Sequence, residues 1–436
     1  MPNNSEHRQL LSGWGNYPKV NTLLKPLGFN DFTQQMIYRG LGRSYGDEAV
    51  LENGTTVTTT THNRILSFDS KKGTVLVQSG ISIKELIDTF IPKGFMPTVC
   101  PGTQYITVGG ALANNIHGKG HHIDGSFVDS VIRFSLVTAN NERVECSKDE
   151  NSELFYANMG GLGLLGFIDT VELQLRPIST SYFETKSFIA KDFDEMLGLL
   201  DTEGLNWHYT VGWIDTLKSS HPGVLVVGKH HISEKKEPKL LDLDTKEPIS
   251  IPELVPNGML NGLSIPILNR VIAFQQKRVN GLVHYKPFFF PLDVLANWNA
   301  GYGSNGFMQF QFVVPIKNGH ENLKLILKAI EHSGCKPFLN VIKRFGKATG
   351  RYLSFPFEGY TLALDFAVNK KSIALCKQLG ALVAKMKGRV YLAKDATLNQ
   401  DNFEFMYPEH YSWKKIKSEI DPNNQFSSSL AKRIGL

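Results

Sequence analysis

The chain has 436 residues, of which 42% are hydrophobic and 20% are charged, and this composition excludes a disordered, collagen-like or coiled-coil protein. The length is about two to three times that of a usual domain, so we expect at least two hydrophobic cores. The 47 basic and 41 acidic residues give a net charge of +6, and because the basic residues are scattered, we expect no nucleic acid as a partner.

The cysteines and the N-terminal residues indicate the cellular compartment in which the protein is expected. Cys100, Cys146, Cys335 and Cys376 are far apart and form no C-x-x-C pair, which disfavours a zinc ribbon or a disulfide framework. Residues 1–20 lack the basic start and apolar core of a signal peptide, and no segment approaches the roughly 18 apolar residues that span a bilayer. We therefore expect a cytoplasmic protein, with contact at the inner membrane surface left open.

The first region predicts short strands and few helices. Residues 55–80 contain two β-rich runs, and the following SIKELIDTFIPKG predicts one helix, with Ser82 as its N-cap and Glu85 as the capping-box partner. Between residues 131 and 176, further strand candidates surround a short helical stretch. This region is α+β and rich in glycine.

From about Ser179 the texture changes. Longer strands alternate with helices, a pattern that suits an antiparallel sheet covered by helices. Residues 232–287 contain several prolines and an apolar piece without a clear period. We predict mobile loops there, forming a lid or a surface-docking insertion, with an ordinary connecting loop as the alternative.

The segment RGLGRSYGD, residues 39–47, is the first of three glycine-rich segments. Gly40, Gly42 and Gly46 allow positive φ and let successive backbone N–H groups point at one anion, such as a pyrophosphate. A tight turn between strands is the alternative. No segment has the G-x-G-x-x-G pattern followed by an acidic residue about 20 positions later, which disfavours a Rossmann fold.

The second segment, residues 101–127, joins a run of small residues to polar and imidazole side chains. The small residues at 108–111 permit close backbone approach to a flat ring system or a phosphate. Asn114, His117 and Lys119 could supply hydrogen bonds to such a ligand. Binding and catalysis could therefore meet here.

Three histidines in this segment, His117, His121 and His122, raise the alternative of a metal site. Gly118 and Gly120 argue against the helix that would align the first two. No carboxylate or thiolate stands at a ligand spacing, so we expect no metal.

The third segment, residues 159–173, places glycines before a strand, which alone is typical of close helix-to-strand packing. The three segments in this order resemble the FAD-binding domain of the vanillyl-alcohol-oxidase and p-cresol-methylhydroxylase (PCMH) type of flavoenzyme. From LSGWGNYP to FSSSLAKRIGL, the chain is also similar to the decaprenylphosphoryl-β-D-ribose 2′-oxidases, the flavoproteins of a 2′-epimerase. Supporting stretches are residues 290–315, 338–360 and 389–398.

The resemblance implies a two-domain architecture. A split FAD-binding domain would comprise residues 1–178 and 389–436, with a substrate-binding domain, residues 179–388, inserted between them. In many relatives a histidine of the first glycine loop is attached covalently to the flavin, and Arg43 stands in that place here. The resemblance therefore implies non-covalent FAD.

The resemblance also implies the cofactor site. Its residues would be Arg39, Gly40, Leu41, Gly42, Arg43, Ser44, Tyr45, Gly102, Thr103, Val108, Gly109, Gly110, Asn114, His117, Gly118, Gly163, Ile168, Tyr391 and Lys394. Oxidation of a secondary alcohol needs a base and a group that stabilises the reduced flavin. Lys394 would be the catalytic cation beside the flavin, and His117 would orient the substrate or accept its proton.

Substrate-binding positions follow from the same resemblance: Lys119, Trp213, Phe289, Gln309, Gln311, Lys343, Phe345, Thr361 and Ala363. Gln309 and Gln311 share one strand face by two-residue alternation, so both amides could point into one pocket or both into solvent. Phe289 replaces a tyrosine of the family, Thr361 an asparagine, and Ala363 the cysteine that covalent nitroaromatic inhibitors attack.

The implied activity is oxidation of the 2′-hydroxyl of a polyprenyl-phosphate pentose to the 2-keto sugar. This would be the first half of an epimerisation in cell-wall arabinan synthesis, completed by a separate NADH-dependent short-chain reductase. Lys343, Arg344, Lys347 and Arg351 offer a basic patch for the phosphate, and the apolar piece at 254–274 could receive the lipid or touch a membrane.

Two alternatives remain open. One is an alditol or sugar-lactone oxidase that uses oxygen as acceptor. The other is a flavin- or carbohydrate-binding protein without catalytic activity.

Overall fold

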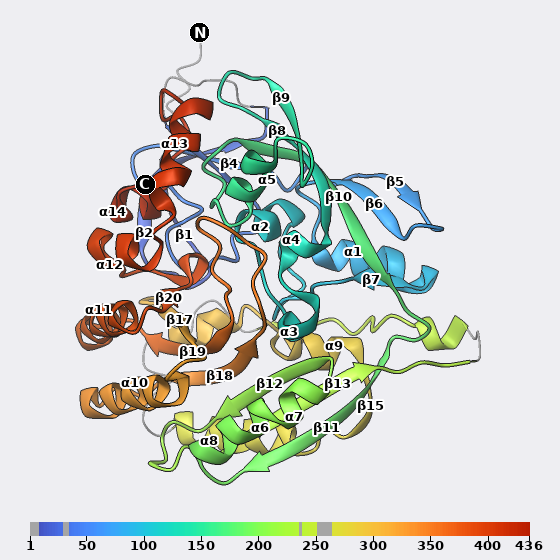
Figure 1. The fold of residues 1–436 in the computed structure, drawn as a ribbon, viewed down its shortest axis with the longest axis vertical. Coiled ribbons are helices and arrows are strands. Elements are labelled where there is room, and N and C mark those ends of the chain that lie inside the picture. The colour runs from blue at the N-terminus through green and yellow to red at the C-terminus, as the bar shows by residue number, and fades with distance from the viewer. Residues whose placement is uncertain (1–7, 29–34, 235–237, 251–263) are drawn as a thin grey trace.

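The computed structural model describes residues 8–28, 35–234, 238–250 and 264–436. Figure 1 shows the sheets of the N-terminal region above the largest sheet. One N-terminal sheet has the order β1-β2-β4-β3 and comprises β1 (Gln9–Ser12), β2 (Lys19–Pro26), β3 (Met36–Arg39) and β4 (Thr55–Thr58). The first glycine-rich segment is the connection between β3 and β4.

A six-stranded sheet follows, with the order β5-β6-β10-β8-β9 and with β7 also paired to β10. Its strands are β5 (Ile65–Asp69), β6 (Thr74–Gln78), β7 (Phe95–Pro97), β8 (Val131–Val137), β9 (Arg143–Ser147) and β10 (Phe167–Pro177). The predicted helix is α1 (Ile83–Phe90). Its capping box is confirmed, because the Ser82 side chain accepts from the Glu85 N–H and the Glu85 carboxylate accepts from the Ser82 N–H.

The largest sheet has eight strands in the order β15-β11-β13-β12-β18-β19-β17-β20, and every neighbouring pair is antiparallel. Its strands are β11 (Tyr182–Ala190), β12 (Tyr209–Ile214), β13 (Gly223–His230), β15 (Gly281–His284), β17 (Phe307–Pro315), β18 (Phe338–Phe345), β19 (Gly359–Ala367) and β20 (Arg389–Val390). The helices α6 (Phe193–Asp201), α7 (Glu203–Asn206), α10 (Gly319–Ser333) and α11 (Lys370–Lys385) pack against it. The predicted α+β class with an antiparallel sheet covered by helices is confirmed.

Shorter elements fill the connections. The N-terminal region contains η1 (Ile91–Lys93), α2 (Val108–Ala113), α3 (His121–Asp124), α4 (Phe127–Ser130) and α5 (Ser152–Asn158). Between β13 and β17 lie η2 (Pro238–Leu241), α9 (Tyr285–Phe289), η3 (Pro291–Val294), η4 (Trp298–Tyr302) and the parallel pair β14 (Ile249–Ser250) and β16 (Leu295–Ala296).

The prediction of loops throughout residues 232–287 is wrong in part. Residues 264–276 form a helix, α8 (Ser264–Gln276), which packs against β13 and β18. Pro266 stands in the first turn of this helix, where the missing N–H of proline costs no hydrogen bond. This proline therefore does not interrupt the helix. Residues 235–237 and 251–263 of this segment lie outside the described residues.

The chain returns to the N-terminal region at its end, through η5 (Leu392–Lys394), α12 (Gln400–Met406), α13 (His410–Ile420) and α14 (Ser429–Ile434) (Figure 1). Trp413 donates its indole N–H to the Ala157 carbonyl at 2.9 Å. Arg433 joins two buried carboxylates, donating to Asp47 at 2.6 Å and to Asp395 at 2.8 Å. Asp395 directly follows η5, so this contact fixes the end of that turn.

The buried apolar side chains of the described residues form one large cluster that runs through both regions, with two small clusters beside it. The two cores expected from the length are therefore joined. The division at residues 178 and 388 stays a prediction.

We expect Arg433→Met to lower the free energy of unfolding by about 3–5 kcal/mol, because it leaves two buried carboxylates without their partner. The matched control is Lys432→Met, which removes the same charge from the exposed neighbouring position and should change stability by less than about 0.5 kcal/mol. Urea denaturation of both variants checks this. Equal losses would contradict a specific role of Arg433.

Candidate active site

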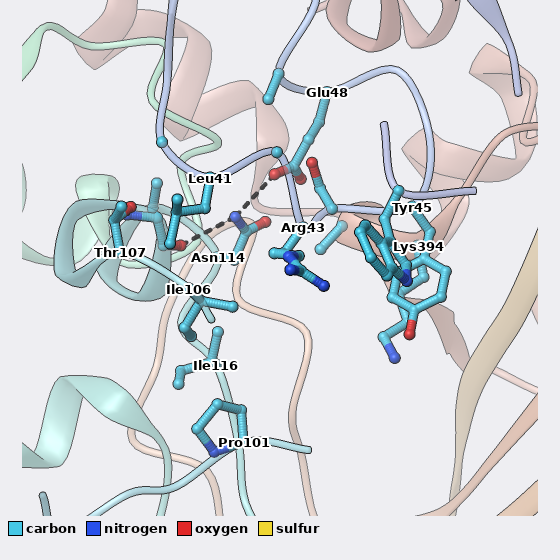
Figure 2. A pocket seen from close by; sticks show the side chains of 18 of the residues that line it. Leu41, Arg43, Tyr45, Glu48, Pro101, Ile106, Thr107, Asn114, Ile116 and Lys394 are labelled. Carbon is cyan, nitrogen blue, oxygen red and sulfur yellow. Dashed lines mark hydrogen bonds between the residues drawn. The ribbon is translucent and has the colours of Figure 1, made fainter. Parts of the chain in front are cut away.

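A cavity of about 310 Å³ is lined by both the N-terminal region and the large sheet. Its wall combines the loop after β3, the start of α2, the glycine turn before β10, the strands β17 to β19, and η5. Figure 2 shows Lys394 beside Tyr45 on one side of this cavity, and the hydrogen-bonded Glu48–Asn114 pair elsewhere on its wall. The three glycine-rich segments, far apart in the sequence, therefore meet in one place.

The loop between β3 and β4 turns sharply and packs directly on the C-terminal segment. Gly42 has a φ of 63°, in the left-handed region that favours glycine. A Cβ at Gly46 would stand 1.8 Å from the Asp395 carbonyl oxygen, so only glycine allows this approach. The Tyr45 N–H donates to the Ala393 carbonyl at 2.9 Å. The loop and η5 thus hold each other in place.

Glu48 is a buried acid on the cavity wall. Asn114 donates to Glu48 Oε1 at 2.8 Å and to the Gly110 carbonyl at 3.0 Å (Figure 2). Burial raises the pKa of Glu48 to about 7. Glu48 Oε2 and Asn114 Oδ1 have no hydrogen-bond partner within the described residues. A ligand with hydroxyl or N–H groups would satisfy these two acceptors.

Arg43 places a stacked cation on the same wall. Its guanidinium lies 3.7 Å from the ring centroid of Trp14 and 5.3 Å from that of Tyr105. Burial lowers the pKa of Arg43, and the Asp293 carboxylate opposes this effect. Asp293 also accepts the Gln104 N–H at 2.9 Å. The position has no imidazole that could bond to a flavin.

The strands β17, β18 and β19 present alternate residues to the cavity. The register pairs Gln309 with Asp365 and Gln311 with Ala363 across β17 and β19. Gln309, Gln311, Ala363 and Lys343 all line the cavity. The inward alternative for the two glutamines is therefore the one that the structure adopts.

Lys394 is joined to a buried carboxylate through an amide. The Lys394 ammonium donates to Gln309 Oε1 and lies 4.5 Å from the ring centroid of Tyr45. Gln309 Nε2 donates to Asp365 Oδ1 at 2.5 Å. Burial lowers the pKa of Lys394 while Asp365 raises it, and burial raises the pKa of Asp365. The protonation state of Lys394 therefore depends on that of Asp365, and the reverse also holds.

His117 is a neutral imidazole. Burial, together with the nearby cation of Lys343, lowers its pKa well below the usual value. Its Nε2 lies 3.0 Å from the Gln311 amide nitrogen, from which it accepts a hydrogen bond. The same amide donates to Thr361 Oγ1 at 3.1 Å. His117 Nδ1 has no partner among the described residues.

Most residues proposed for cofactor binding lie on the cavity wall. These are Gly40, Leu41, Gly42, Arg43, Ser44, Tyr45, Gly102, Thr103, Gly109, Gly110, Asn114, His117, Gly163, Ile168, Tyr391 and Lys394. That these residues lie on the wall of one cavity is a property of the fold. Their roles in cofactor binding remain proposals.

Other proposed residues do not line this cavity. Gly118, Lys119 and Phe289 line a small neighbouring pocket. Val108 is buried in the main core, and Trp213 is buried on β12. Behind the wall, Thr361 and Phe345 contact Gln311 and His117, and Arg39 donates to the Ser12 carbonyl at 2.8 Å.

The four residues of the predicted basic patch do not lie on one surface. Lys343 lines the cavity, but its neighbour Arg344 donates to Asp201 at 2.8 Å. Successive residues of a strand point to opposite faces, which separates these two cations. Lys347 is exposed, and Arg351 stacks on a tyrosine ring at 4.3 Å.

Sequence reasoning missed several polar and aromatic residues: Trp14, Glu48, Asp293, Trp298 and Asp365. Asp365 had a signal, because a lone carboxylate in the apolar strand YTLALDFAV must be buried with a partner. Glu48 directly follows the first glycine-rich segment. Trp14 lies in the N-terminal stretch that carries the resemblance, where it received no role.

Comparisons with known proteins agree with this arrangement. Residues 29–147 match the family model described as an FAD binding domain, and residues 305–434 match that of D-arabinono-1,4-lactone oxidase. The chain is 35% identical over 413 residues to decaprenylphosphoryl-beta-D-ribose oxidase of Mycolicibacterium smegmatis, covering 92% of this chain and 89% of that protein. The chain belongs to the PCMH-type family of FAD-linked oxidoreductases.

Two further relatives extend the family. An uncharacterized protein of Streptomyces coelicolor is 29% identical, covering 82% of this chain and 100% of the relative. L-gulonolactone oxidase of Scyliorhinus torazame is 22% identical, covering 90% of this chain and 88% of the relative. This oxidoreductase therefore belongs to a family that acts on CH–OH groups of alcohols and lactones.

The cavity fits FAD. A Cβ at Gly102 would meet no atom within 4 Å, so this glycine leaves open space at the wall. Glu48 Oε2 and Asn114 Oδ1, unpartnered among the described residues, offer acceptors to the hydroxyl and N–H donors of the cofactor.

We expect Asp365→Asn to lower the pKa of Lys394 by about one pH unit or more, because it removes the only carboxylate that raises this pKa among the described residues. NMR titration of ¹³C-labelled lysine side chains measures this, with Asp401→Asn, an exposed aspartate, as control. An unchanged Lys394 titration would mean that Asp365 carries no charge.

Proposed function

We propose that this oxidoreductase oxidises the 2′-hydroxyl of a polyprenyl-phosphate pentose to the 2-keto sugar, as the first half of an epimerisation in cell-envelope polysaccharide synthesis. A separate NADH-dependent short-chain reductase would complete the epimerisation. The observation that carries this proposal is the 35% identity, over 92% of the chain, to decaprenylphosphoryl-beta-D-ribose oxidase. Lys343 and Lys394, two basic side chains on the cavity wall, are consistent with an anionic substrate.

We propose that Lys394 accepts the proton of the substrate hydroxyl and then stabilises the negative charge that the reaction produces. FAD, when bound, accepts the carbinol hydride. Since burial lowers the pKa of Lys394, its neutral amine is available to take the substrate hydroxyl proton. The ammonium that results then stabilises negative charge on the reduced cofactor. Asp365, through Gln309, holds the amine in place.

His117 is proposed to orient the substrate rather than to deprotonate it. Its lowered pKa makes it a weak base, and its Nε2 lone pair is already engaged by Gln311. Ala363, opposite Gln311 on β19, leaves no thiol on this wall. Covalent trapping by compounds that require a cysteine there should fail.

Contact with a membrane surface is a further part of the proposal. Within the described ranges, no helix combines the length and apolar character that crossing a bilayer requires. On α8, Val271 and Phe274 are exposed, with Arg270 and Arg278 close by in sequence. We propose that this surface contacts the inner face of the membrane, where a polyprenyl chain resides.

A second candidate is a sugar-lactone or alditol oxidase that passes electrons to oxygen. The match of residues 305–434 to the D-arabinono-1,4-lactone oxidase family favours it. The two candidates differ in the charge of the substrate and in the electron acceptor.

We expect a prenylphosphoryl ribose to bleach the flavin absorbance under anaerobic conditions, while free alditols and sugar lactones leave it unchanged. The phosphate should increase the reduction rate because the cavity wall carries cations. Anaerobic stopped-flow spectroscopy across these compounds measures this. Fast reduction by a lactone, followed by fast reoxidation in air, would instead establish the second candidate.

We also propose that FAD is bound without a covalent bond, since Arg43 occupies the loop position that carries a histidine in many relatives. Acid precipitation should release all the yellow cofactor into the supernatant, with its FAD spectrum intact. Flavin that remains in the washed pellet would refute this.

A further inference from the structure

The side-chain amide of Gln311, on β17, is held against the cavity wall by two other buried side chains. Gln311 is 3% exposed, Thr361 1% and His117 8%. The Gln311 Nε2 atom lies 3.0 Å from His117 Nε2 and 3.1 Å from Thr361 Oγ1. An amide nitrogen carries two hydrogens, and these two contacts use both. The amide can therefore offer only its carbonyl oxygen to a molecule in the cavity.

Charged groups do not fix the orientation of this amide, in contrast to that of Gln309. Gln309 donates to the Asp365 carboxylate and accepts from the Lys394 ammonium. A carboxylate accepts and an ammonium donates, so these two groups allow Gln309 one orientation. The partners of Gln311 are an imidazole nitrogen and a hydroxyl group, and each of these can donate or accept. The orientation of Gln311 therefore depends on which nitrogen of its imidazole partner carries the hydrogen.

The surroundings of His117 favour the tautomer that this orientation requires. Burial and the Lys343 cation lower the pKa of His117 well below its usual value, so the imidazole is neutral and carries one hydrogen. The rings of Phe345, Phe355 and Tyr391 lie 4.8, 5.6 and 5.2 Å from it, centroid to centroid. Its Nδ1 has no partner among the described residues. An aromatic face attracts an N–H and repels a bare lone pair, so the hydrogen belongs on Nδ1, which leaves Nε2 to accept.

We propose that Thr361 is a positioning residue: together with His117 it fixes the Gln311 carbonyl oxygen toward the cavity, where this oxygen accepts a hydrogen bond from a substrate hydroxyl group. Gln311 lines the cavity, so there is open space in front of its amide. Such a wall selects a hydroxyl group, which can donate, over an ether or carbonyl oxygen, which cannot. The inference rests on the proposed function only in that the substrate carries hydroxyl groups, as the substrates of both candidate functions do.

NMR of the FAD-loaded protein with ¹⁵N-labelled histidine tests the positioning role without any substrate, with the His117 signals assigned by their loss in His117→Gln. We expect wild-type His117 to carry its hydrogen on Nδ1. Thr361→Val removes one acceptor of the amide, so the amide should turn and the hydrogen should move toward Nε2. Thr361→Ser should restore the wild-type pattern, and Thr361→Ala serves if the Val variant does not fold.

The matched control is Thr185→Val on β11 of the same sheet. Thr185 is buried and donates to the Gly281 carbonyl at 3.0 Å, and it is not among the described residues that line the cavity. This variant should leave the His117 signals as they are in the wild type. A hydrogen on Nε2 in the wild type, or the same His117 pattern in Thr361→Val as in the wild type, would overturn the inference.

Anaerobic stopped-flow reduction of the flavin tests the contact with the substrate hydroxyl. We expect Thr361→Val to raise the dissociation constant of the substrate about tenfold, because a buried hydrogen bond to the substrate is lost. The limiting reduction rate should change by less than about threefold, since Gln311 binds the substrate and does not take its proton. Thr361→Ser should bind substrate as the wild type does. An unchanged dissociation constant in Thr361→Val, or weakened binding of FAD in its place, would overturn the hydroxyl contact.

The outcomes separate this inference from the proposed function. If prenylphosphoryl ribose does not reduce the wild-type flavin and a sugar lactone does, the proposed function is wrong. The dissociation constants of the variants are then compared with that lactone, which also carries hydroxyl groups. The tautomer of His117 is measured without substrate, so it decides the role of Thr361 in either case.

Discussion

A positive charge inside a protein needs a partner, and this constraint shapes the cavity. Lys394, Lys343 and Lys119 are gathered in and beside it, and Asp365 is the one carboxylate that raises the pKa of any of them in the described residues. Asp365 is only 1% exposed and acts on Lys394 through Gln309. Among the described residues, Lys343 on the cavity wall therefore has no carboxylate that offsets its burial.

The scaffold produces this arrangement by ordinary means. The registers of β17, β18 and β19 place alternate side chains on one face, so amides, a lysine and a carboxylate meet there without a loop to carry them. The backbone of the glycine loop packs directly against the residue that follows η5, because Gly46 has no side chain. Any side chain at this position would collide with the Asp395 carbonyl oxygen. Arg433 then anchors Asp395 from the C-terminal helix. A rigid sheet thus sets the polar groups, and glycines set the space in front of them.

Much of this could be read from the sequence. The capping box at Ser82, the antiparallel sheet and the shared strand face of Gln309 and Gln311 follow from local sequence patterns, which depend on few residues. The helix α8 was missed because its apolar run has no clear period and carries a proline. The prediction of one basic patch was wrong because it grouped charges by their nearness in the sequence. The alternation of side chains along a strand already places Lys343 and Arg344 on opposite faces.

The remaining site could not be derived locally. Glu48 and Asn114 are 66 positions apart, and Lys343 and Lys119 come from different regions, so only the tertiary fold shows that they are neighbours. The absence of a counter-charge is likewise a property of the folded cavity, since the composition holds nearly as many acidic as basic residues.

In the proposed mechanism the partly buried Lys394 amine takes the substrate proton, and the glycine-lined cavity holds FAD. Single-turnover flavin reduction by the Lys394→Met variant tests it most directly. We predict that the variant binds FAD in a one-to-one ratio and that its reduction rate falls by about 10²–10³. A wild-type reduction rate in the FAD-loaded variant would contradict the account.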